Sequence, residues 1–257
     1  MASSTTTFSF FFLTLFLFSP SHSSSDNNNN NKVSLELYYE SLCPYSANFI
    51  VNYLPQIFND DELASIVDLK LFPWGNAKLR GNGTFTCQHG EYECLLNTVE
   101  ACAIDAWPQL SNHFPFIYCV EDLVYQGKYR KWESCFEKLD LDSKPIDQCY
   151  HSERGKELEL LYAAETDNLQ PPHEYVPWVV VDGEPLYEDY ENFLSYICKA
   201  YKGRNAPGVC TQAYLNTIRK VEPKNKRGAC YKERVTSTLA KIWSTILSWM
   251  NYLGDAI

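Results

Sequence analysis

The sequence has little positive charge, and it has no N-terminal apolar run long enough to cross a bilayer. Lysine and arginine number 22 against 32 acidic residues, which gives a formal net charge of −10 at pH 7. A nucleic-acid partner is not expected, because the chain has no basic patch to meet phosphates. The apolar stretch at residues 8–18 is interrupted by Ser9 and Thr14, and it is shorter than the roughly 20 residues that a membrane-spanning helix needs. We therefore expect no transmembrane helix.

The same stretch is typical of a secretory signal peptide, although no lysine or arginine precedes it. Small polar residues follow it, and cleavage near residues 23–25 would make residues 1–24 the signal peptide. A retained signal anchor is the alternative. Five asparagines at 27–31 predict a disordered linker over residues 25–32, since such a tract has nothing to bury.

All ten cysteines lie after the predicted signal peptide. This density is typical of an oxidising compartment and unusual in the cytosol. The single Asn-x-Thr sequon, Asn82-Gly83-Thr84, is usable for a glycan in a secreted protein, so we expect glycosylation at Asn82.

One further absence concerns residues 43–46, which read Cys-Pro-Tyr-Ser and lack a second cysteine. Residues 33–42 predict a strand, and Pro44 suits the first turn of a following helix. A cysteine at that junction faces unpaired N–H groups and the positive end of the helix dipole, which stabilise its thiolate. Cys43 is therefore the predicted nucleophile, and Ser46 occupies the position of a resolving cysteine. The alternative is that Cys43 is an ordinary disulfide cysteine.

The order of predicted elements indicates the fold. The predicted strands are 33–42, 66–74 and 176–181, with a turn at Asp182-Gly183 into 185–187, and the predicted helices after the first are 91–106, 114–126, 129–139, 153–167 and 190–201. This order predicts an α/β protein with a thioredoxin-like fold over residues 33–215. A disulfide-bonded helical insertion, about residues 88–170, separates the second and third core strands.

Val176-Pro177 precedes the third predicted strand. In this fold a proline at that position lies beside the active-site cysteine, and a cis bond there would turn the backbone of Val176 toward an extended substrate. We therefore expect Val176 and Pro177 to bind substrate. The alternative is a proline that merely begins a strand.

A third motif lies at residues 87–102, which read Cys-Gln-His-Gly-x2-Glu-Cys-x2-Asn-x4-Cys. All eight fixed positions of this 16-residue span match the signature of the gamma-interferon-inducible lysosomal thiol reductase family, which the chain resembles from about Leu35 to Cys210. The resemblance implies a thioredoxin-like soluble glycoprotein that reduces protein disulfides in an acidic lytic compartment. The family's first active-site cysteine falls on Cys43 and its second on Ser46, which is the departure.

Cys43 can still attack a disulfide, but Ser46 cannot resolve the mixed disulfide that forms. We therefore expect a monothiol thiol-disulfide oxidoreductase that acts on disulfide-containing proteins, with an external thiol such as glutathione or cysteine and no bound cofactor. A catalytically silent member that binds or traps cysteine-containing clients is the main alternative, and a disulfide-stapled structural protein is another. The expected location is the secretory pathway, either extracellular or in a vacuole or lysosome.

The other cysteines are expected to be structural. Cys94 and Cys102 cannot bond to each other, because they would lie about 12 Å apart along one helix. Their predicted partners are among Cys87, Cys119, Cys135 and Cys149. Cys198 and Cys210 are also expected to be structural. A zinc site at Cys87, His89, Cys94 and Cys102 is not expected from their spacing, and His89 is read as a loop residue with a satisfied hydrogen bond.

Cys230 is the candidate for an odd cysteine if Cys43 is free. It could be free, could link two chains in a dimer, or could cap Cys43 in a precursor. It lies in a basic segment that precedes an amphipathic stretch, and together these form residues 216–257. This tail could dock on its own domain or lie on a membrane surface. Because relatives in the family lose a C-terminal segment, it is also a candidate propeptide.

Overall fold

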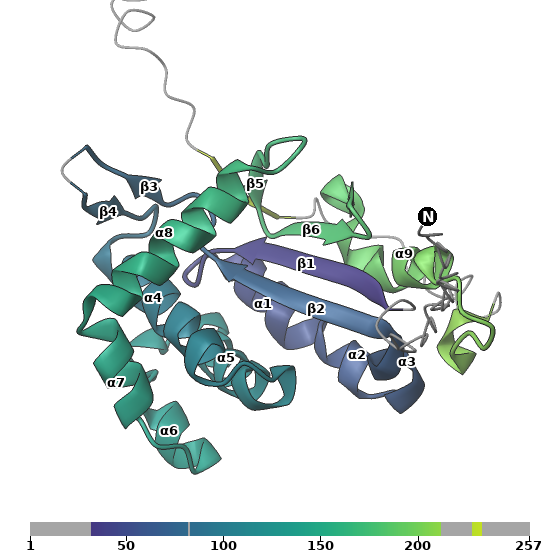
Figure 1. Ribbon diagram of the computed structural model, residues 1–257, viewed down its shortest axis with the longest axis horizontal. Helices are drawn as coiled ribbons and strands as arrows, with labels where there is room; N and C mark the ends of the chain where they lie inside the picture. The colour runs from purple at the N-terminus through teal and green to yellow at the C-terminus, as the bar shows by residue number, and fades with distance from the viewer. Residues whose placement is uncertain (1–31, 82, 212–227, 233–257) are drawn as a thin grey trace, which may run out of the picture. The chain divides into compact units, whose positions relative to one another are not determined.

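The computed structural model describes residues 32–81, 83–211 and 228–232 (Figure 1). The predicted signal peptide, the linker before Lys32, the sequon residue Asn82 and most of the 216–257 tail lie outside the described residues, so those assignments stay predictions. Within the described ranges, no helix is both long and apolar enough to cross a membrane.

The central sheet has four strands in the order β2-β1-β6-β7. Their bounds are Val33–Tyr39 for β1, Val67–Pro73 for β2, Trp178–Val181 for β6 and Glu184–Pro185 for β7. β1 and β2 are parallel, whereas β6 is antiparallel to β1 and β7 returns antiparallel to β6. The predicted βαβ unit and the following hairpin are therefore confirmed.

Alternation along β1 explains how the sheet is covered. Leu35 and Leu37 are fully buried and pack with Phe49 of α1 (Pro44–Asn52) and with Phe193 of α9 (Phe193–Ala200). Tyr38 belongs to a separate cluster on the opposite face. Burial of one such apolar side chain contributes about 1.5–3 kcal/mol. This core fixes the end of β1 against the start of α1, where Cys43 lies.

Two short helices, α2 (Pro55–Phe58) and α3 (Asp61–Ile66), connect α1 to β2. α3 occupies the start of the predicted second strand, which begins one residue later than expected. The 3₁₀ helix η3 (Tyr187–Asn192) precedes α9, so the predicted helix at 190–201 is split between two elements.

The insertion between β2 and β6 contains five α-helices within the described residues. They are α4 (Glu91–Ala106), α5 (Leu110–Tyr125), α6 (Ser134–Leu139), α7 (Lys144–Tyr150) and α8 (Glu153–Asp167). Figure 1 shows them as a block beside the sheet, with their own apolar core. The helical insertion is confirmed, and the bounds of α4 and α8 match those predicted. The predicted helix at 129–139 is instead the 3₁₀ helix η2 (Tyr129–Lys131) followed by α6.

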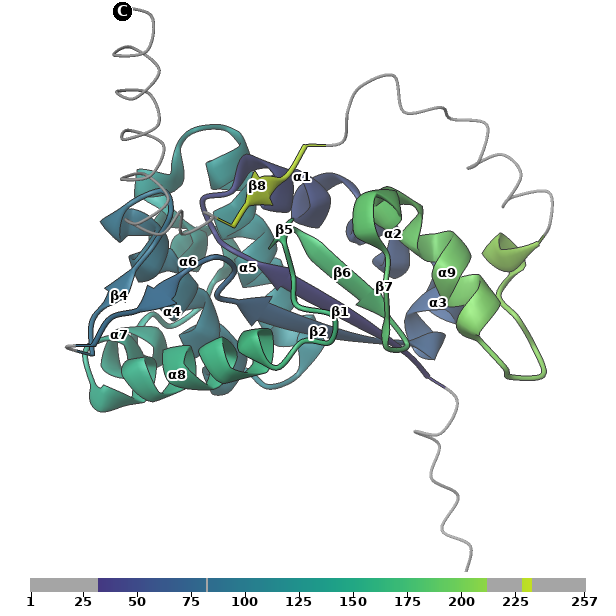
Figure 2. The same cartoon turned by 90° about the horizontal axis from the view of Figure 1, so that it is seen from above.

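Four two-residue strands and the 3₁₀ helix η4 (Gly208–Cys210) complete the part of the chain that the structure describes. β3 (Lys78–Leu79) and β4 (Phe85–Thr86) form a hairpin, and β5 (Tyr175–Val176) pairs antiparallel with β8 (Cys230–Tyr231). Figure 2 shows β8 lying beside β5, close to the start of α1. The pairing brings the segment at 228–232, which we call the tail strand, to the predicted active site.

Candidate active site

Cys43 lies at the N-cap of α1, directly after the loop that follows β1. Its backbone N–H donates to the carbonyl of Glu40 over 3.1 Å, and Pro44 occupies the first turn of the helix. The side chain is fully buried, and its sulfur is bonded to that of Cys230, with the two Cα atoms 6.1 Å apart. The predicted position at a strand-to-helix junction is therefore confirmed.

Cys43 is not free in this structure, so the condition under which one cysteine would be left over is not met. All ten cysteines are paired, because Cys43 and Cys230 bond to each other and the remaining eight form four bonds. Of the three alternatives for Cys230, the structure contains the cap on Cys43. This bond also leaves no sulfur at position 230 for a disulfide-linked dimer.

The Val176-Pro177 peptide bond is cis, and it lies beside the disulfide. The carbonyl oxygen of Val176 is 3.7 Å from the sulfur of Cys43. We treat this as a contact, because a sulfur in a disulfide carries no proton to donate. Cys43, Val176 and Cys230 form one buried cluster. The structure thus brings together the two regions, near 43 and near 176, that the sequence places in one site.

Ser46 lies in the first turn of α1 and is fully buried. Its hydroxyl oxygen has no hydrogen-bond partner among the described residues. A buried hydroxyl without a partner loses its hydrogen bonds to water without replacing them, which costs about 1–3 kcal/mol. The position of the resolving cysteine is therefore occupied by a buried hydroxyl that has no hydrogen-bond partner among the described residues.

His89 is placed against the disulfide by a buried carboxylate. Its Nδ1 atom lies 2.5 Å from Glu93 Oε2, and its backbone N–H donates to Glu93 Oε1 over 3.0 Å. Its Nε2 atom is 3.9 Å from the sulfur of Cys230. The hydrogen bond to Glu93 raises the pKa of His89, so the ring carries two protons at acidic pH. The predicted satisfied hydrogen bond exists, but the ring also faces a sulfur atom.

A second carboxyl, Glu40, completes this group. Its Oε1 atom is 3.4 Å from His89 Nδ1, and its Oε2 accepts the backbone N–H of Asn76 over 2.9 Å. Burial, together with the nearby charge of Glu93, raises the pKa of Glu40 to about 8. Gly75 passes so close that a Cβ atom there would lie 2.7 Å from the Glu40 side chain, and its φ of +59° also favours glycine.

The remaining residues of the 87–102 signature hold this site in place. Gln88 Nε2 donates to the carbonyl of Tyr231 over 2.8 Å. Asn97 Oδ1 accepts the backbone N–H of Ser41 over 2.9 Å, which fixes the loop before Cys43. Gly90 precedes α4 with a φ of +94°, a value that side-chain-bearing residues rarely adopt. The signature is therefore one structural unit around the Cys43 sulfur.

The predicted structural cysteines all form disulfides. The bonds are Cys87–Cys94, Cys102–Cys149, Cys119–Cys135 and Cys198–Cys210. The partners of Cys94 and Cys102 are among those predicted. Because three of the four residues considered for zinc are in disulfides, they offer no thiolate. Glu40, His89 and Cys230 have ligand atoms within 4.8 Å of one another, but the sulfur of Cys230 is committed to Cys43.

Sequence reasoning missed Asn76 and Glu40, which the structure places in this site. Asn76 Nδ2 donates to the carbonyl of Cys230 over 2.9 Å and to Gln88 Oε1 over 3.0 Å. Each residue lies shortly after a core strand. Glu40 directly follows β1, and Asn76 lies three residues after the end of β2. The carboxyl ends of parallel strands meet at one edge of a sheet, and that signal could have found them.

The sheet order, the proline before β6 and the cysteine at the N-terminus of α1 define the class. The fold matches that of the "MdbA protein, a thiol-disulfide oxidoreductase from Actinomyces oris", with a TM-score of 0.50 and 14% identity, over 68% of this chain and 85% of that one. At this identity the match shows the fold alone. The protein is thioredoxin-like and has the cysteine position of a thiol-disulfide oxidoreductase.

Comparison with known sequences gives the family. Residues 34–139 match the family model described as Gamma interferon inducible lysosomal thiol reductase. The chain is 45% identical to "Gamma-interferon-responsive lysosomal thiol protein" of Arabidopsis thaliana, over 80% of this chain and 87% of the relative. It is 38% identical to "Gamma-interferon-inducible lysosomal thiol reductase" of Mus musculus, over 78% and 77%. The chain belongs to the gamma interferon inducible lysosomal thiol reductase family, which confirms the resemblance and the class of enzyme.

Proposed function

We propose that this protein reduces disulfide bonds of client proteins through Cys43, with an external thiol as the reductant. One observation carries the proposal. Cys43 is bonded to a cysteine on a strand that pairs with Val176, next to the cis-proline. This is the arrangement that a mixed disulfide with an extended client would have.

The chemistry has three exchanges that balance. The Cys43 thiolate attacks one sulfur of the client disulfide, and the other client sulfur leaves as a thiolate and takes up a proton. An external thiolate then attacks the Cys43 sulfur, which expels the second client sulfur and leaves Cys43 bonded to the external thiol. A second external thiol frees Cys43. Two external thiols are oxidised to one disulfide for each client disulfide that is reduced.

His89 supports the release step in this proposal. In the mixed disulfide the client sulfur takes the place of the Cys230 sulfur, 3.9 Å from His89 Nε2. A protonated ring can donate to that sulfur as it leaves, because Nδ1 is already hydrogen-bonded to Glu93. This assistance matters here because Ser46 cannot act as a resolving thiol.

We place the reaction in the secretory pathway, in an acidic vacuole or lysosome rather than outside the cell. The names of the relatives support the lysosomal placement.

The test is reduction of a disulfide-bonded protein by glutathione or cysteine, at pH 5 and pH 7, after the enzyme is first reduced. Wild type should catalyse the reaction and Cys43→Ser should not, whereas equal activity of the two would refute the proposal. The absence of a resolving thiol at Ser46 also favours a second function, the trapping of clients. Trapping predicts Cys43-linked mixed disulfides that excess glutathione does not release.

A further inference from the structure

We propose that the tail strand, residues 228–232, is a tethered substitute for a client, and that Asn76 and Gln88 are the side chains that bind a client's backbone when the tail leaves. The inference rests on the proposed function and adds to it a binding site and a closed state. Its ligand class is an extended peptide on either side of a cysteine.

The tail strand is held by main-chain pairing. β8 lies antiparallel to β5 with Cys230 opposite Val176, and the N–H of Lys232 donates to the carbonyl of Glu174 over 2.8 Å. Addition of a strand to an exposed edge is a common mode of peptide recognition, and its affinity comes from backbone hydrogen bonds. The register places the cysteine of the added strand directly against Cys43.

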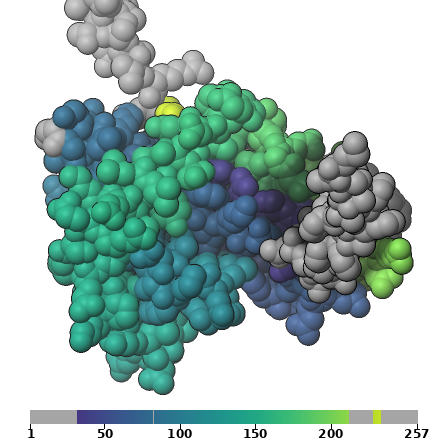
Figure 3. Space-filling model, viewed as in Figure 1, coloured from purple at the N-terminus to yellow at the C-terminus, as the bar shows by residue number. Residues whose placement is uncertain are grey.

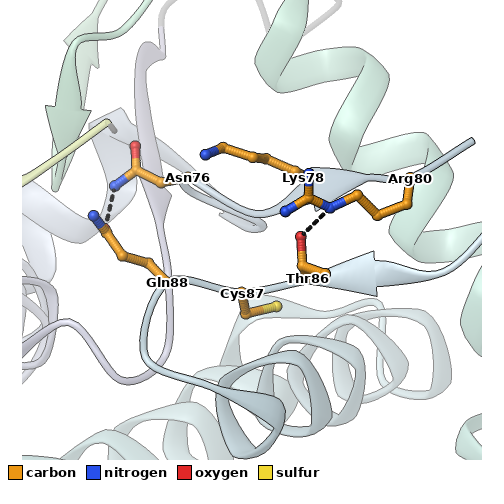
Figure 4. A pocket seen from close by; sticks show the side chains of 6 residues that line it. All are labelled: Asn76, Lys78, Arg80, Thr86, Cys87 and Gln88. Carbon is orange, nitrogen blue, oxygen red and sulfur yellow. Dashed lines mark hydrogen bonds between the residues drawn. The ribbon is translucent and has the colours of Figure 1, made fainter. Parts of the chain in front are cut away.

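Two side-chain amides also bind main-chain carbonyls of the tail strand. Asn76 Nδ2 donates to the carbonyl of Cys230, and Gln88 Nε2 donates to the carbonyl of Tyr231. Figure 4 shows the side chains of Asn76 and Gln88 pointing toward each other, joined by their own hydrogen bond. Both residues line a pocket of about 130 Å³. Both amides contact main-chain oxygens, which every client has. The site therefore recognises a strand without reading its sequence.

The site recognises the side chains of the tail strand much less than it recognises the backbone. Tyr231 is 57% exposed. Figure 3 shows the yellow tail strand at the surface, between the blue β3–β4 region and the green chain near β5. Gly228 is the exception, because a Cβ atom there would clash with the ring of Tyr45. Its carbonyl also accepts the hydroxyl of Tyr190 over 3.0 Å. A glycine at this point lets the chain pass over the Cys-Pro-Tyr-Ser motif.

The closed state follows from burial. With the tail strand in place, Cys43 is fully buried and its sulfur is bonded, so it cannot attack a client. Opening needs two electrons: two external thiols are oxidised to one disulfide, and Cys43 and Cys230 become thiols. The same reductant that drives turnover therefore opens the enzyme.

The first experiment compares the oxidised wild type with Cys230→Ser in the full chain, using a disulfide-bonded peptide and glutathione. Wild type should show a lag that preincubation with thiol removes, and Cys230→Ser should react without a lag. The inference is overturned if Cys230→Ser is slower than pre-reduced wild type, because Cys230 would then act in turnover rather than as a cap.

The second experiment tests the amides in the Cys230→Ser background. Gln88→Glu keeps the shape and removes the donor, so KM for the peptide should rise about fivefold, the value of one hydrogen bond. The rate with a small aromatic disulfide that has no peptide backbone should not change. Asn76→Ser should also raise KM for the peptide. Asn112→Ser and Gln126→Glu change exposed amides in the same way and are matched controls.

Unchanged KM for the peptide in both site variants would refute the backbone site. Failure of the proposed function gives a different result, since Cys43→Ser in the Cys230→Ser background would then remain active. Loss of activity toward both the peptide and the small disulfide in Gln88→Glu would also overturn the inference, because it would indicate a role other than backbone binding.

Discussion

At the scale of single residues, Ser46 has the clearest effect on mechanism. It is fully buried three residues after Cys43, and its hydroxyl has no hydrogen-bond partner among the described residues, so a thiol there would break no hydrogen bond. Ser46→Cys should supply an internal resolving thiol. We expect turnover at low glutathione to rise on the order of tenfold or more, because an attack within one molecule replaces a collision.

The measurement is the rate of peptide disulfide reduction against glutathione concentration, with Ser46→Ala as the matched control. The control should behave as wild type, since alanine adds no nucleophile. If Ser46→Cys needs as much glutathione as wild type, then resolution of the mixed disulfide is not the step that Ser46 limits.

His89 gives a prediction about pH. The hydrogen bond to Glu93 raises its pKa, so the ring is protonated below that pKa and loses its proton as pH rises through it. His89→Gln should therefore slow client release at pH 5, on the order of 10- to 100-fold, and less at higher pH. Single-turnover release of a labelled client from the Cys43 mixed disulfide measures the step directly.

Glu93→Gln separates a catalytic from a structural role of His89. It keeps the shape of the side chain but removes the charge that supports the protonated ring, so the pH edge of release should move to lower pH while the maximal rate is largely kept. A uniform loss of rate at every pH would instead mean that His89 only holds the loop.

The residues of this site differ in how well the sequence predicted them. Cys43 and Val176 follow from local rules, since a cysteine between a strand and a helix and a proline before a strand are visible in short windows. The contact of His89 with a sulfur cannot be seen in a short window of sequence, because its partner Cys230 lies 141 residues away. No periodicity specifies such a distant pairing.

At the scale of elements, too, local sequence patterns can be predicted whereas pairings between distant residues cannot. The bounds of α4 match those predicted because its apolar residues recur at helical spacing over 16 residues. The two-residue strands β3, β4, β5 and β8 are too short to show a period of two, and tertiary pairing alone defines them. The sequence therefore predicts only a basic segment where the structure has the tail strand.

The insertion gives a prediction of its own. Cys102–Cys149 joins α4 to α7 across a sequence separation of 47, whereas Cys198–Cys210 spans 12. The entropy of loop closure grows with loop length, so the longer loop should stabilise by about 4 kcal/mol and the shorter by about 3. The Cys102→Ala/Cys149→Ala pair should lower the free energy of unfolding more than Cys198→Ala/Cys210→Ala.

Urea unfolding of the two double variants at pH 5 checks this order. Neither bond belongs to the buried cluster of Cys43, Val176 and Cys230, so each folded variant should keep thiol reductase activity. A larger loss of unfolding free energy in the Cys198→Ala/Cys210→Ala pair would show that packing of α9, rather than loop length, determines how much each bond stabilises the fold.

At the scale of the whole molecule, the notable feature is a set of buried carboxyl groups. Burial raises the pKa of Glu40 and of Glu159 to about 8, and that of Glu100 to about 7. Burial and the nearby Glu100 carboxyl raise the pKa of Glu121 well above its usual value. Glu100 also accepts the hydroxyl of Tyr39 over 2.5 Å. The folded protein therefore binds protons that the unfolded chain releases near its ordinary carboxyl pKa.

This set makes folding stability depend on pH. A carboxyl whose pKa is raised on folding contributes its full stability below the unfolded pKa of about 4.5, and the contribution is lost as pH rises through the folded pKa of about 7–8. The melting temperature should therefore fall between pH 5 and pH 8, by on the order of 5–10 °C. Differential scanning calorimetry across that range measures it.

Two buried histidines change the folding stability with pH in the opposite direction. The sign of the change in melting temperature therefore shows which groups dominate. Burial lowers the pKa of His113, and it lowers that of His173 to about 4, so acid must charge both at a cost to the folded state. The histidines lower the folding stability mainly below pH 6.5. The carboxyls change it above pH 4.5 and are more numerous. Glu100→Gln/Glu121→Gln should flatten the fall toward pH 8, and the exposed Glu137→Gln should leave it unchanged. A melting temperature that rises from pH 5 to pH 8 would mean that the histidines dominate, and the fold would then not be suited to an acidic compartment.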